Sequence, residues 1–211
     1  MAQISNVWDS LAQKYDGLWV QKYSLNPTRR AVKTVLAQHL KNSDAALLDL
    51  GCGTGQLLCE LEKNYPDAIL FGADKSVEMI RAAQDKLSGS TLYNMNIDTD
   101  NLPKVIQEDT LDAIVCCHSF PYYQNKPAVL EKLYKALKTD GILIFAQASA
   151  NNLYDRFVLS FVVKTAESGE YLPRRNFRDL VSPHFTIKSE FSVKERFFMP
   201  SICGFVLEKR L

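Results

Sequence analysis

Three glycines and an aspartate stand at fixed spacing in the segment Asp49-Leu-Gly51-Cys-Gly53-Thr-Gly55. Glycine lets the backbone approach a ligand closely and adopt conformations that other residues avoid. An apolar run precedes the segment and a helical pattern follows it, so free N–H groups at a helix start would face a bound molecule. The pattern predicts a loop that binds a nucleotide-like ligand with a negative charge or a carboxylate. A glycine-rich turn without a ligand is the alternative.

A dinucleotide-binding loop has the spacing G-x-G-x-x-G, which would place its third glycine at position 56. That position is Gln56, and the observed spacing is G-x-G-x-G with an acidic residue two positions before it. The sequence also lacks a recognisable Tyr-Lys or Ser set for hydride transfer. Both observations disfavour an NAD-dependent oxidoreductase.

Strand and helix patterns alternate through the middle of the chain. Short apolar runs predict strands that are buried on both faces, and apolar residues at helical spacing predict the helices between them. The predicted strands are 45–50, 68–73, 92–95, 111–117 and 142–147, and the predicted helices are 56–64, 77–87 and 126–137, the last capped by Asn125. This alternation predicts a doubly wound parallel sheet with helices on both faces.

The two ends of the chain follow a different pattern. Helices are predicted over 7–19 and 27–40, the second with Asn26 as its cap and Pro27 at its first position. Helices over 151–165 and 174–181 precede two strands, 185–197 and 202–207. We therefore expect an α/β, Rossmann-like, seven-stranded and mostly parallel sheet with an antiparallel C-terminal hairpin at its edge.

The composition is that of an ordinary globular protein. The 211 residues are 46% hydrophobic and 23% charged, with a net charge of +1, so no general charge attracts nucleic acid. No apolar run approaches the ~20 residues that span a bilayer, and no signal-peptide pattern begins the chain. We expect a cytoplasmic protein without stable membrane insertion. Five cysteines without C-x-x-C spacing indicate reduced thiols and no metal site.

The segment Asp49–Gly55 resembles motif I of the class I S-adenosylmethionine-dependent methyltransferases, whose loop wraps the methionine part of the cofactor. The resemblance covers roughly residues 45–148. It implies that Asp74 accepts hydrogen bonds from both ribose hydroxyls and that Asp98 accepts one from the adenine amino group. Helix capping for Asp74 and turn formation for Asp98 are the alternatives. The implied cofactor-binding set is Tyr15, Asp49, Gly51, Cys52, Gly53, Gly55, Asp74, Lys75, Met79, Asp98, Thr99 and Cys117.

The segment from Trp8-Asp9 to Tyr15-Asp16 is similar to the lead-in of the family's quinone-biosynthesis members, with Trp8 in place of Phe. There the tyrosine lies against the cofactor as part of a lid; an ordinary core aromatic is the alternative for Tyr15. The resemblance implies one domain over 1–211, with a helical lid (1–43), a cofactor-binding core (44–148) and acceptor-binding helices with the edge hairpin (149–211).

Cofactors bind outside the carboxyl ends of parallel strands, so the transferred methyl group is expected near the end of the 111–117 strand. His118 is the candidate general base there, because imidazole ordinarily titrates near neutral pH. Positioning or capping is the alternative for His118, and Tyr122 or Tyr123 is a candidate for orienting the acceptor. Alignment of the reacting atoms without any base is a further alternative.

Nucleic-acid amino-methyltransferases carry Asn or Asp followed by Pro-Pro-Tyr where this chain has Ser119-Phe120-Pro121-Tyr122, so we expect a small acceptor. Candidates for the acceptor-pocket wall, with helix packing as the alternative, are Tyr154, Phe157, Phe161 and Tyr171. Candidates for attracting an anionic substrate, with a solvated helix face as the alternative, are Arg174, Arg175 and Arg178. The expected activity is methyl transfer to O, N or C of a small molecule. A non-catalytic cofactor-binding protein and a phospholipid headgroup N-methyltransferase remain alternatives, and the sequence does not indicate an oligomeric state.

Overall fold

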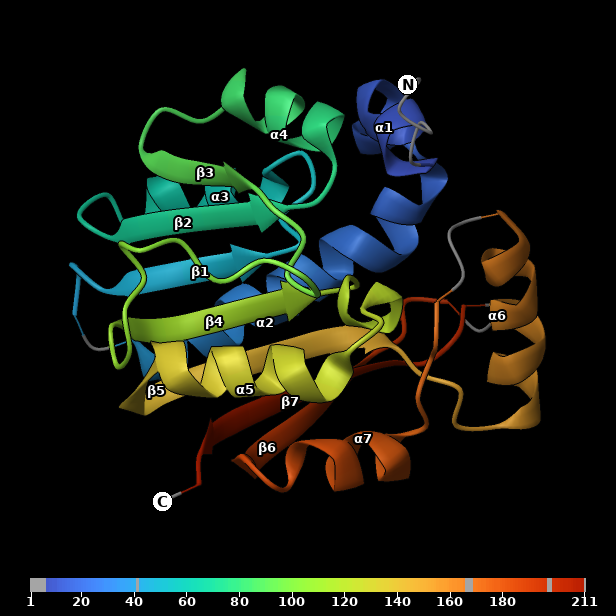
Figure 1. The fold of residues 1–211 in the computed structure, drawn as a ribbon. Coiled ribbons are helices and arrows are strands. Elements are labelled where there is room, and N and C mark those ends of the chain that lie inside the picture. The colour runs from blue at the N-terminus through green and yellow to red at the C-terminus, as the bar shows by residue number, and fades with distance from the viewer. Residues whose placement is uncertain (1–6, 41, 166–168, 197–198, 211) are drawn as a thin grey trace.

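A seven-stranded sheet forms the centre of the molecule in the computed structural model, which describes residues 7–40, 42–165, 169–196 and 199–210 (Figure 1). The strands are β1 (Ala46–Leu50), β2 (Ile69–Asp74), β3 (Ser90–Asn94), β4 (Leu111–Cys117), β5 (Leu137–Ala148), β6 (Phe185–Val193) and β7 (Ile202–Lys209). Their order across the sheet is β3-β2-β1-β4-β5-β7-β6. The pairs from β3 to β5 are parallel, and β7 is antiparallel to both β5 and β6. This confirms the predicted fold class.

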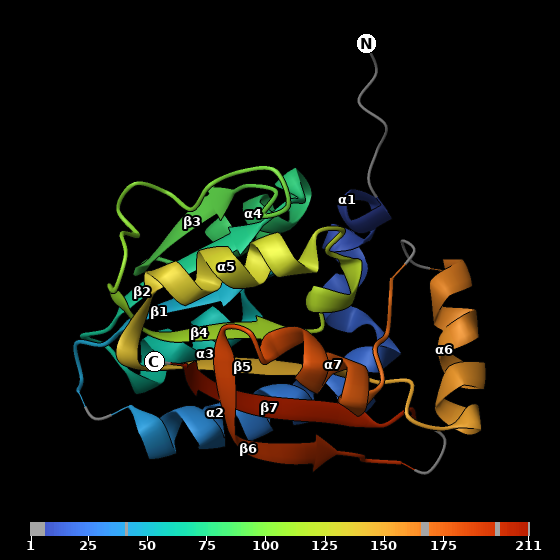
Figure 2. The same ribbon diagram turned by 60° about the horizontal axis from the view of Figure 1, so that its bottom comes forward.

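Helices cover both faces of the sheet (Figures 1 and 2). The α-helices are α1 (Val7–Leu11), α2 (Asn26–His39), α3 (Gln56–Asn64), α4 (Val77–Gln84), α5 (Lys126–Ala136), α6 (Leu153–Thr165) and α7 (Arg174–Val181). Side chains of α5 and α7 pack with Phe145 and Phe205 on one face, and side chains of α2 and α3 pack with Val115 and Ile144 on the other. Because both faces are covered, the central strands contain continuous apolar runs, which made them predictable from the sequence.

The N-terminal segment differs from the predicted helix over 7–19. It consists of α1, a 3₁₀ segment (Ala12–Gly17) and, after a break with Leu18 extended, a π-helical turn (Gln21–Leu25) that continues into α2. Asn26 is itself helical and caps nothing, so the predicted cap is wrong although Pro27 does lie in the first turn.

Several other element boundaries also differ from the predictions. β3 begins at Ser90, two residues before the predicted start. The prediction missed these residues because this edge strand is partly exposed and its first residues are not apolar. α4 ends at Gln84 and β6 ends at Val193, both earlier than predicted. β5 begins at Leu137, five residues before the apolar run that predicted it. The predicted end of β6 at Phe197 lies outside the described residues.

Helix α6 lies apart from the layered core, beyond the carboxyl ends of the strands (Figures 1 and 2). Asp155 and Leu159 are its buried side chains among residues 153–160. The exposed fractions of Leu153 (83%), Phe157 (63%) and Tyr154 (44%) leave an apolar face uncovered. No helix within the described ranges is long and apolar enough to cross a membrane.

Candidate active site

A cleft opens where β1, β2 and β4 end. Parallel strands place their carboxyl ends at one edge, and the loops after them supply the walls. The lining residues are Trp8, Tyr15, Leu50, Gly51, Gly53, Ala73, Asp74, Lys75, Met79, Met95, Asn96, Ile97, Asp98, Cys117, His118, Ser119, Tyr122 and Tyr123. Residues from three separate ranges, 8–15, 50–98 and 117–123, therefore meet in one cleft.

A second cavity shares five residues with this cleft and adds charged ones. The shared residues are Tyr15, Gly51, Gly53, Cys117 and His118. The additional lining comes from Arg29 on α2, Asp49 on β1, and Leu25, Cys52, Thr54, Gln56 and Leu57. The two cavities together form a continuous candidate site with different chemistry at each end.

The loop glycines have different roles. Gly51, Gly53 and Gly55 all have positive φ angles (76°, 53° and 75°). A Cβ on Gly51 would lie 2.3 Å from Ser119 Cβ, whereas a Cβ on Gly53 would meet only Tyr15 Cε1 at 3.8 Å. The loop therefore passes against Ser119 at Gly51 and leaves open space at Gly53, where a ligand can approach the backbone.

Gly55 faces the protein instead of either cavity. A Cβ at this position would lie 2.7 Å from Leu87 Cδ1 and 3.1 Å from Ala83 Cβ. This glycine allows the start of α3 to pack closely against the end of α4. The structure thus gives Gly55 a packing role, and its predicted place in the cofactor-binding set gains no support from the cavity lining.

Asp74 ends β2 with both carboxylate oxygens held by backbone donors. Oδ2 accepts from Gly53 N–H at 2.9 Å and Oδ1 accepts from Ser76 N–H at 2.9 Å. Burial raises the pKa of this carboxyl group, and the two N–H donors oppose that rise. Each oxygen keeps a second lone pair, so the group can still accept from a diol in the cleft. Ser76 is the N-cap of α4, so the capping alternative for Asp74 is wrong.

Asp98 is held at the far end of the cleft. Its Oδ1 accepts from the N–H groups of Gln124 and Asn125, both at 2.9 Å, which joins the loop after β3 to the start of α5. Lys132 supports the same loop, because its Nζ donates to Ile97 O and to Asp100 O, each at 2.7 Å. Asp98 also lines the cleft.

Asp49 is a buried carboxyl group that lines the second cavity together with the partly buried Arg29. Its side chain is 4% exposed. Burial and the charge of Asp74 raise its pKa to about 7, while Arg29 acts in the opposite direction. Arg29 donates to Glu60, Gln21 and Asn26, which fixes its guanidinium at the second cavity. A carboxylate and a guanidinium in one small cavity match the ammonium and carboxylate of an α-amino acid.

Two aspartates fasten the N-terminal segment over the cleft. Asp9 Oδ1 accepts from Ser76 Oγ at 2.5 Å, at the N-terminus of α4. Asp16 Oδ1 accepts from Thr54 Oγ1 at 2.5 Å and from Gln56 Nε2 at 2.8 Å, at the N-terminus of α3, and Asp16 also pairs with Lys86. Negative side chains at helix N-termini are favoured by the helix dipole. These contacts hold the segment between them in place, and with it Tyr15 in the wall of the cleft.

Aromatic rings form the wall near the end of β4. Trp8 contacts Tyr122 edge-to-face, with ring centroids 5.1 Å apart, and Tyr15 at 6.5 Å. Tyr122 Oη lies 2.8 Å from Tyr171 Oη, so the segment after α6 supports this wall. Burial raises the pKa of Tyr15 to about 12, so its hydroxyl stays protonated.

His118 follows β4 in the left-handed backbone region, with φ 59°. Its Nε2 lies 3.0 Å from Thr28 Oγ1 on α2, and its ring lines both cavities. Burial and the nearby Arg29 lower the pKa of His118 to about 4. The expectation that this imidazole titrates near neutral pH is therefore wrong: it is a neutral ring whose surroundings disfavour the imidazolium.

Residues 48–143 match the methyltransferase domain family. The chain is 31% identical over 111 residues to malonyl-[acyl-carrier protein] O-methyltransferase of Priestia megaterium, covering 53% of this chain and 39% of that protein. It is 24% identical over 157 residues to the ubiquinone/menaquinone biosynthesis C-methyltransferase of Desulfotalea psychrophila, covering 74% of this chain and 63% of that protein. Over these stretches the chain is similar to methyltransferases.

Solved structures of methyltransferases have the same fold. The putative methyltransferase of Haloferax volcanii, in complex with the Trm112 methyltransferase activator, superposes with a TM-score of 0.78 at 16% identity, covering 97% of this chain and 99% of that one. Geranyl diphosphate C-methyltransferase from Streptomyces coelicolor, solved with S-adenosyl-L-homocysteine, has a TM-score of 0.68 at 11% identity, covering 86% and 76%. The chain spans less than two thirds of the length of the curated relatives described above.

The lining of this site fits S-adenosylmethionine, whose demethylated product is bound in the geranyl diphosphate C-methyltransferase structure. Asp49 and Arg29 offer opposite charges to the amino-acid end, Gly53 gives open space beside the loop, and Asp74 offers acceptors for a diol. Asp98 supplies a further acceptor in the lining of the cleft.

The structure brings most of the predicted cofactor residues together. Those that line a cavity are Tyr15, Asp49, Gly51, Cys52, Gly53, Asp74, Lys75, Met79, Asp98 and Cys117. Thr99 lies outside the lining, where its Oγ1 donates to Asp100 Oδ1 at 3.0 Å. His118 and Tyr122, the predicted catalytic residues, both line the cleft. The individual roles of these residues stay predictions.

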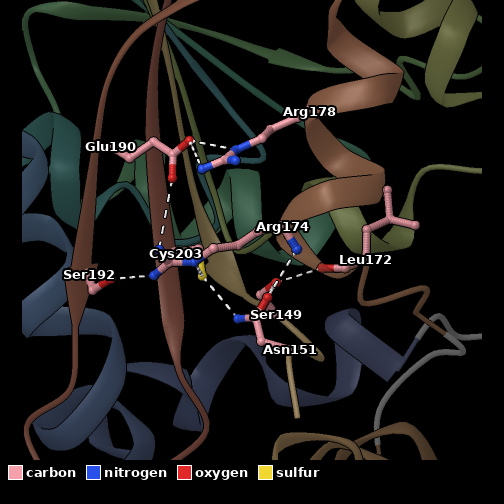
Figure 3. Close-up of polar contacts among 8 residues, drawn as sticks. All are labelled: Ser149, Asn151, Leu172, Arg174, Arg178, Glu190, Ser192 and Cys203. Atoms are coloured by element: carbon pink, nitrogen blue, oxygen red, sulfur yellow. Dashed lines mark hydrogen bonds and ion pairs between the residues drawn. The ribbon is translucent and has the colours of Figure 1, made fainter.

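The arginines predicted as substrate-attracting groups are engaged elsewhere (Figure 3). Arg174 donates from Nε to Cys203 Sγ at 2.9 Å and pairs with Glu190, as does Arg178 at 2.8 Å. Arg174 N–H also donates to Asn151 Oδ1 at 3.0 Å. These contacts tie α7 to β6 and β7, so the two arginines are structural cross-links.

The predicted acceptor-pocket wall is only partly formed. Tyr171 reaches the wall through Tyr122, whereas Tyr154 and Phe157 are exposed on α6. Arg175 is also exposed. The side chain of Phe161 lies outside the described residues.

Sequence reasoning missed three residues at the site. Arg29 and Thr28 come from the first turn of α2, where no motif distinguishes them from other polar helix residues. Trp8 was noted only as a replacement within the N-terminal pattern. The sequence signal for the position of Trp8 was the pair of acidic residues in the same N-terminal pattern, Asp9 and Asp16. The structure shows that these two residues anchor the N-terminal segment.

Proposed function

We propose that this protein transfers the methyl group of S-adenosylmethionine to N, O or C of a small molecule. The observation that carries the proposal is that Asp49 and Arg29 line one cavity, which shares five residues with the cleft lined by Asp74 and Asp98. An NAD-type ligand would place a pyrophosphate where this chain has the Asp49 carboxylate. The charges therefore favour an amino-acid tail.

In this proposal, Asp49 binds the ammonium and Arg29 the carboxylate of the amino-acid part. Asp74 accepts from the ribose hydroxyls through the lone pairs left free by Gly53 and Ser76. Asp98 accepts from the adenine amino group. Its Oδ1 already accepts from two backbone N–H groups, and the carboxylate retains acceptor capacity for a further donor. Bound in this way, the donor supplies an electrophilic methyl group on a sulfonium at the end of β4.

The N-terminal region, residues 1–43, acts as a lid over the cleft. The residues beyond 148 hold the acceptor. Trp8 and Tyr15 cover the cleft, while Tyr122, supported by Tyr171, faces the position where the acceptor enters. Aromatic walls exclude water and align the nucleophile with the methyl carbon, and such alignment supplies a large share of the rate in an in-line displacement. We propose a single catalytic domain over 1–211 on this basis.

A small acceptor is favoured over nucleic acid. The net charge of +1 provides no field for a polyanion, and the Asn- or Asp-Pro-Pro-Tyr clamp is replaced by Ser119-Phe120-Pro121-Tyr122. All five cysteines are free, which is consistent with a cytoplasmic location.

Calorimetry with S-adenosylhomocysteine tests the cofactor assignment, and NAD serves as the control ligand. Activity is tested by incubating the protein with metabolite extracts and a donor labelled with a trideuteromethyl group, and by searching for labelled products. Binding together with a labelled product supports the proposal. Binding without any product would leave a non-catalytic cofactor-binding protein, and a thermal shift with NAD equal to that with S-adenosylhomocysteine would overturn the cofactor assignment.

A phospholipid headgroup N-methyltransferase is the second candidate, favoured by the uncovered apolar face of α6. Leu153, Tyr154 and Phe157 stand exposed on this helix beyond the carboxyl ends of the strands. Vesicles containing phosphatidylethanolamine, assayed with the same labelled donor, separate the two candidates. Labelled lipid would favour the second, and labelled water-soluble product the first.

A further inference from the structure

The ring of His118 is held by a hydrogen-bond chain that fixes where its proton resides. Thr28 Oγ1 donates its single hydrogen to Ser24 O at 2.8 Å. His118 Nε2 lies 3.0 Å from the same hydroxyl oxygen. Because the hydroxyl hydrogen is directed to Ser24 O, the oxygen acts as the acceptor toward His118, and Nε2 must carry the ring proton. Neutral imidazole has one proton, which leaves Nδ1 with a lone pair.

The elements around this chain make the arrangement rigid. Thr28 is fully buried, and Ser24 lies in the π-helical turn that precedes α2, a type of irregularity often found at functional sites. His118 N–H donates to Ala146 O at 2.8 Å, which fixes the backbone of the residue at its positive φ angle. The ring therefore has little freedom to exchange its two nitrogens.

The second ring nitrogen is left for a ligand. Within the described ranges, Nδ1 has no hydrogen-bond partner and is not among the sealed, unpaired polar atoms. The ring lines both cavities at the junction where the sulfonium end of the cofactor would lie. The titratable and charged groups that share the second cavity with it are Tyr15, Arg29, Asp49, Cys52 and Cys117.

We propose that Thr28 positions His118 as the Nε2–H tautomer, so that Nδ1 accepts the proton that the acceptor loses during methyl transfer. This inference rests on the proposed methyltransferase function. The acceptor's lone pair forms the new bond to the methyl carbon, and the electron pair of the broken C–S bond remains on sulfur. The proton leaves the acceptor atom for Nδ1, and the imidazolium then releases it to water.

The surroundings of the ring suit a transient acceptor. Arg29 and burial keep the ring neutral at physiological pH, so the lone pair is present before the reaction. The same groups disfavour the imidazolium, so the ring releases the proton readily after transfer. Thr28 touches neither substrate nor cofactor, and its role is to position His118.

The first test reads the tautomer without any substrate. Nitrogen-15 NMR of the unliganded protein distinguishes Nε2–H from Nδ1–H rings by their proton–nitrogen couplings. His39 supplies an internal reference, because its Nδ1 lies 2.8 Å from Val35 O and must carry the proton there. We expect opposite tautomers for His39 and His118. An Nδ1–H ring at His118 would overturn the proposal, whatever the enzyme's activity.

The second test compares matched variants on the identified acceptor. Thr28→Val keeps the shape of the side chain but removes the hydrogen-bond acceptor, and we expect turnover to fall roughly 10- to 100-fold with unchanged S-adenosylhomocysteine affinity. Thr28→Ser restores the hydroxyl and should recover most of the turnover together with the Nε2–H signal. Thr34→Val is the matched control, because Thr34 makes the same bond to Arg30 O on an exposed face of α2.

The outcomes separate this inference from the proposed function. Wild-type turnover in Thr28→Val, with the parent active, would refute the positioning role and leave the methyltransferase assignment intact. A parent protein that binds no S-adenosylhomocysteine and labels no acceptor would refute the proposed function, and the proton-accepting role with it.

Discussion

Replacing the buried carboxylate of Asp49 with an amide should stabilise the unliganded protein while weakening cofactor binding. The pKa of Asp49 rises from 3.8 to about 7 on folding, because its side chain is 4% exposed and Asp74 is close. Between these pH values the folded state holds a proton that the unfolded chain has released. The contribution of Asp49 to the free energy of unfolding is therefore fully present below about pH 4 and is lost as the pH rises toward 7.

The magnitude follows from the shift. About three pKa units at 1.36 kcal/mol each give about 4 kcal/mol of destabilisation above pH 7. Asparagine has no charge to bury, but its amide still costs about 1–3 kcal/mol if it lacks partners. We therefore expect Asp49→Asn to raise the free energy of unfolding by about 1–3 kcal/mol at pH 8, and to change it much less at pH 5.

Urea unfolding at pH 5 and pH 8 measures this difference, and calorimetry with S-adenosylhomocysteine measures the loss of binding. Asp112→Asn is the control, because Asp112 pairs with Lys138 at the opposite end of β4. This control should lose stability slightly and bind the cofactor normally. An Asp49→Asn effect that is equal at both pH values would refute the reasoning, since it would show that no titration of the carboxylate is involved.

Three further substitutions probe other parts of the site. Asp74→Asn should weaken S-adenosylhomocysteine binding by about 1–3 kcal/mol, measured by calorimetry, because it removes a charged acceptor from the diol site; unchanged affinity would contradict the ribose assignment. Gly51→Ala should abolish cofactor binding in the same assay and lower the melting temperature, because its Cβ would lie 2.3 Å from Ser119 Cβ. Asp16→Ala should speed proteolysis of the N-terminal segment and raise the KM for the cofactor, since the segment loses its hydrogen bonds to Thr54 and Gln56 at the start of α3; an unchanged cleavage rate would show that the other contacts suffice.

The core of the fold was predictable because its local signals agree with its tertiary environment. Leu47 and Leu48 point to opposite faces of β1, yet both are buried, so β1 contains an unbroken apolar run. Ser90 and Thr91 begin β3 at the sheet edge, where pairing with β2 and not side-chain burial defines the strand. That information is absent from the local sequence.

The site divides in the same way. The Asp49–Gly55 loop and Asp74 follow directly from strands, so their positions came from local pattern alone. Arg29 and Thr28 reach the site only because α2 crosses the sheet beneath the end of β4, a contact over 90 residues of sequence for Thr28 and His118. The lowered pKa of His118 depends on that same contact region, and no residue type or spacing could indicate it.

The order in which the site is completed during folding follows from the anchors of the N-terminal segment. Its contacts span long stretches of chain: 38 residues from Asp16 to Thr54, 67 from Asp9 to Ser76 and 90 from Thr28 to His118. Contacts of such separation form late, because loop closure is costly until the intervening strands have paired. A chain leaving the ribosome thus carries the cover of its cleft before the cleft itself exists. Cofactor binding will consequently report the completion of the whole sheet, not the formation of the glycine loop alone.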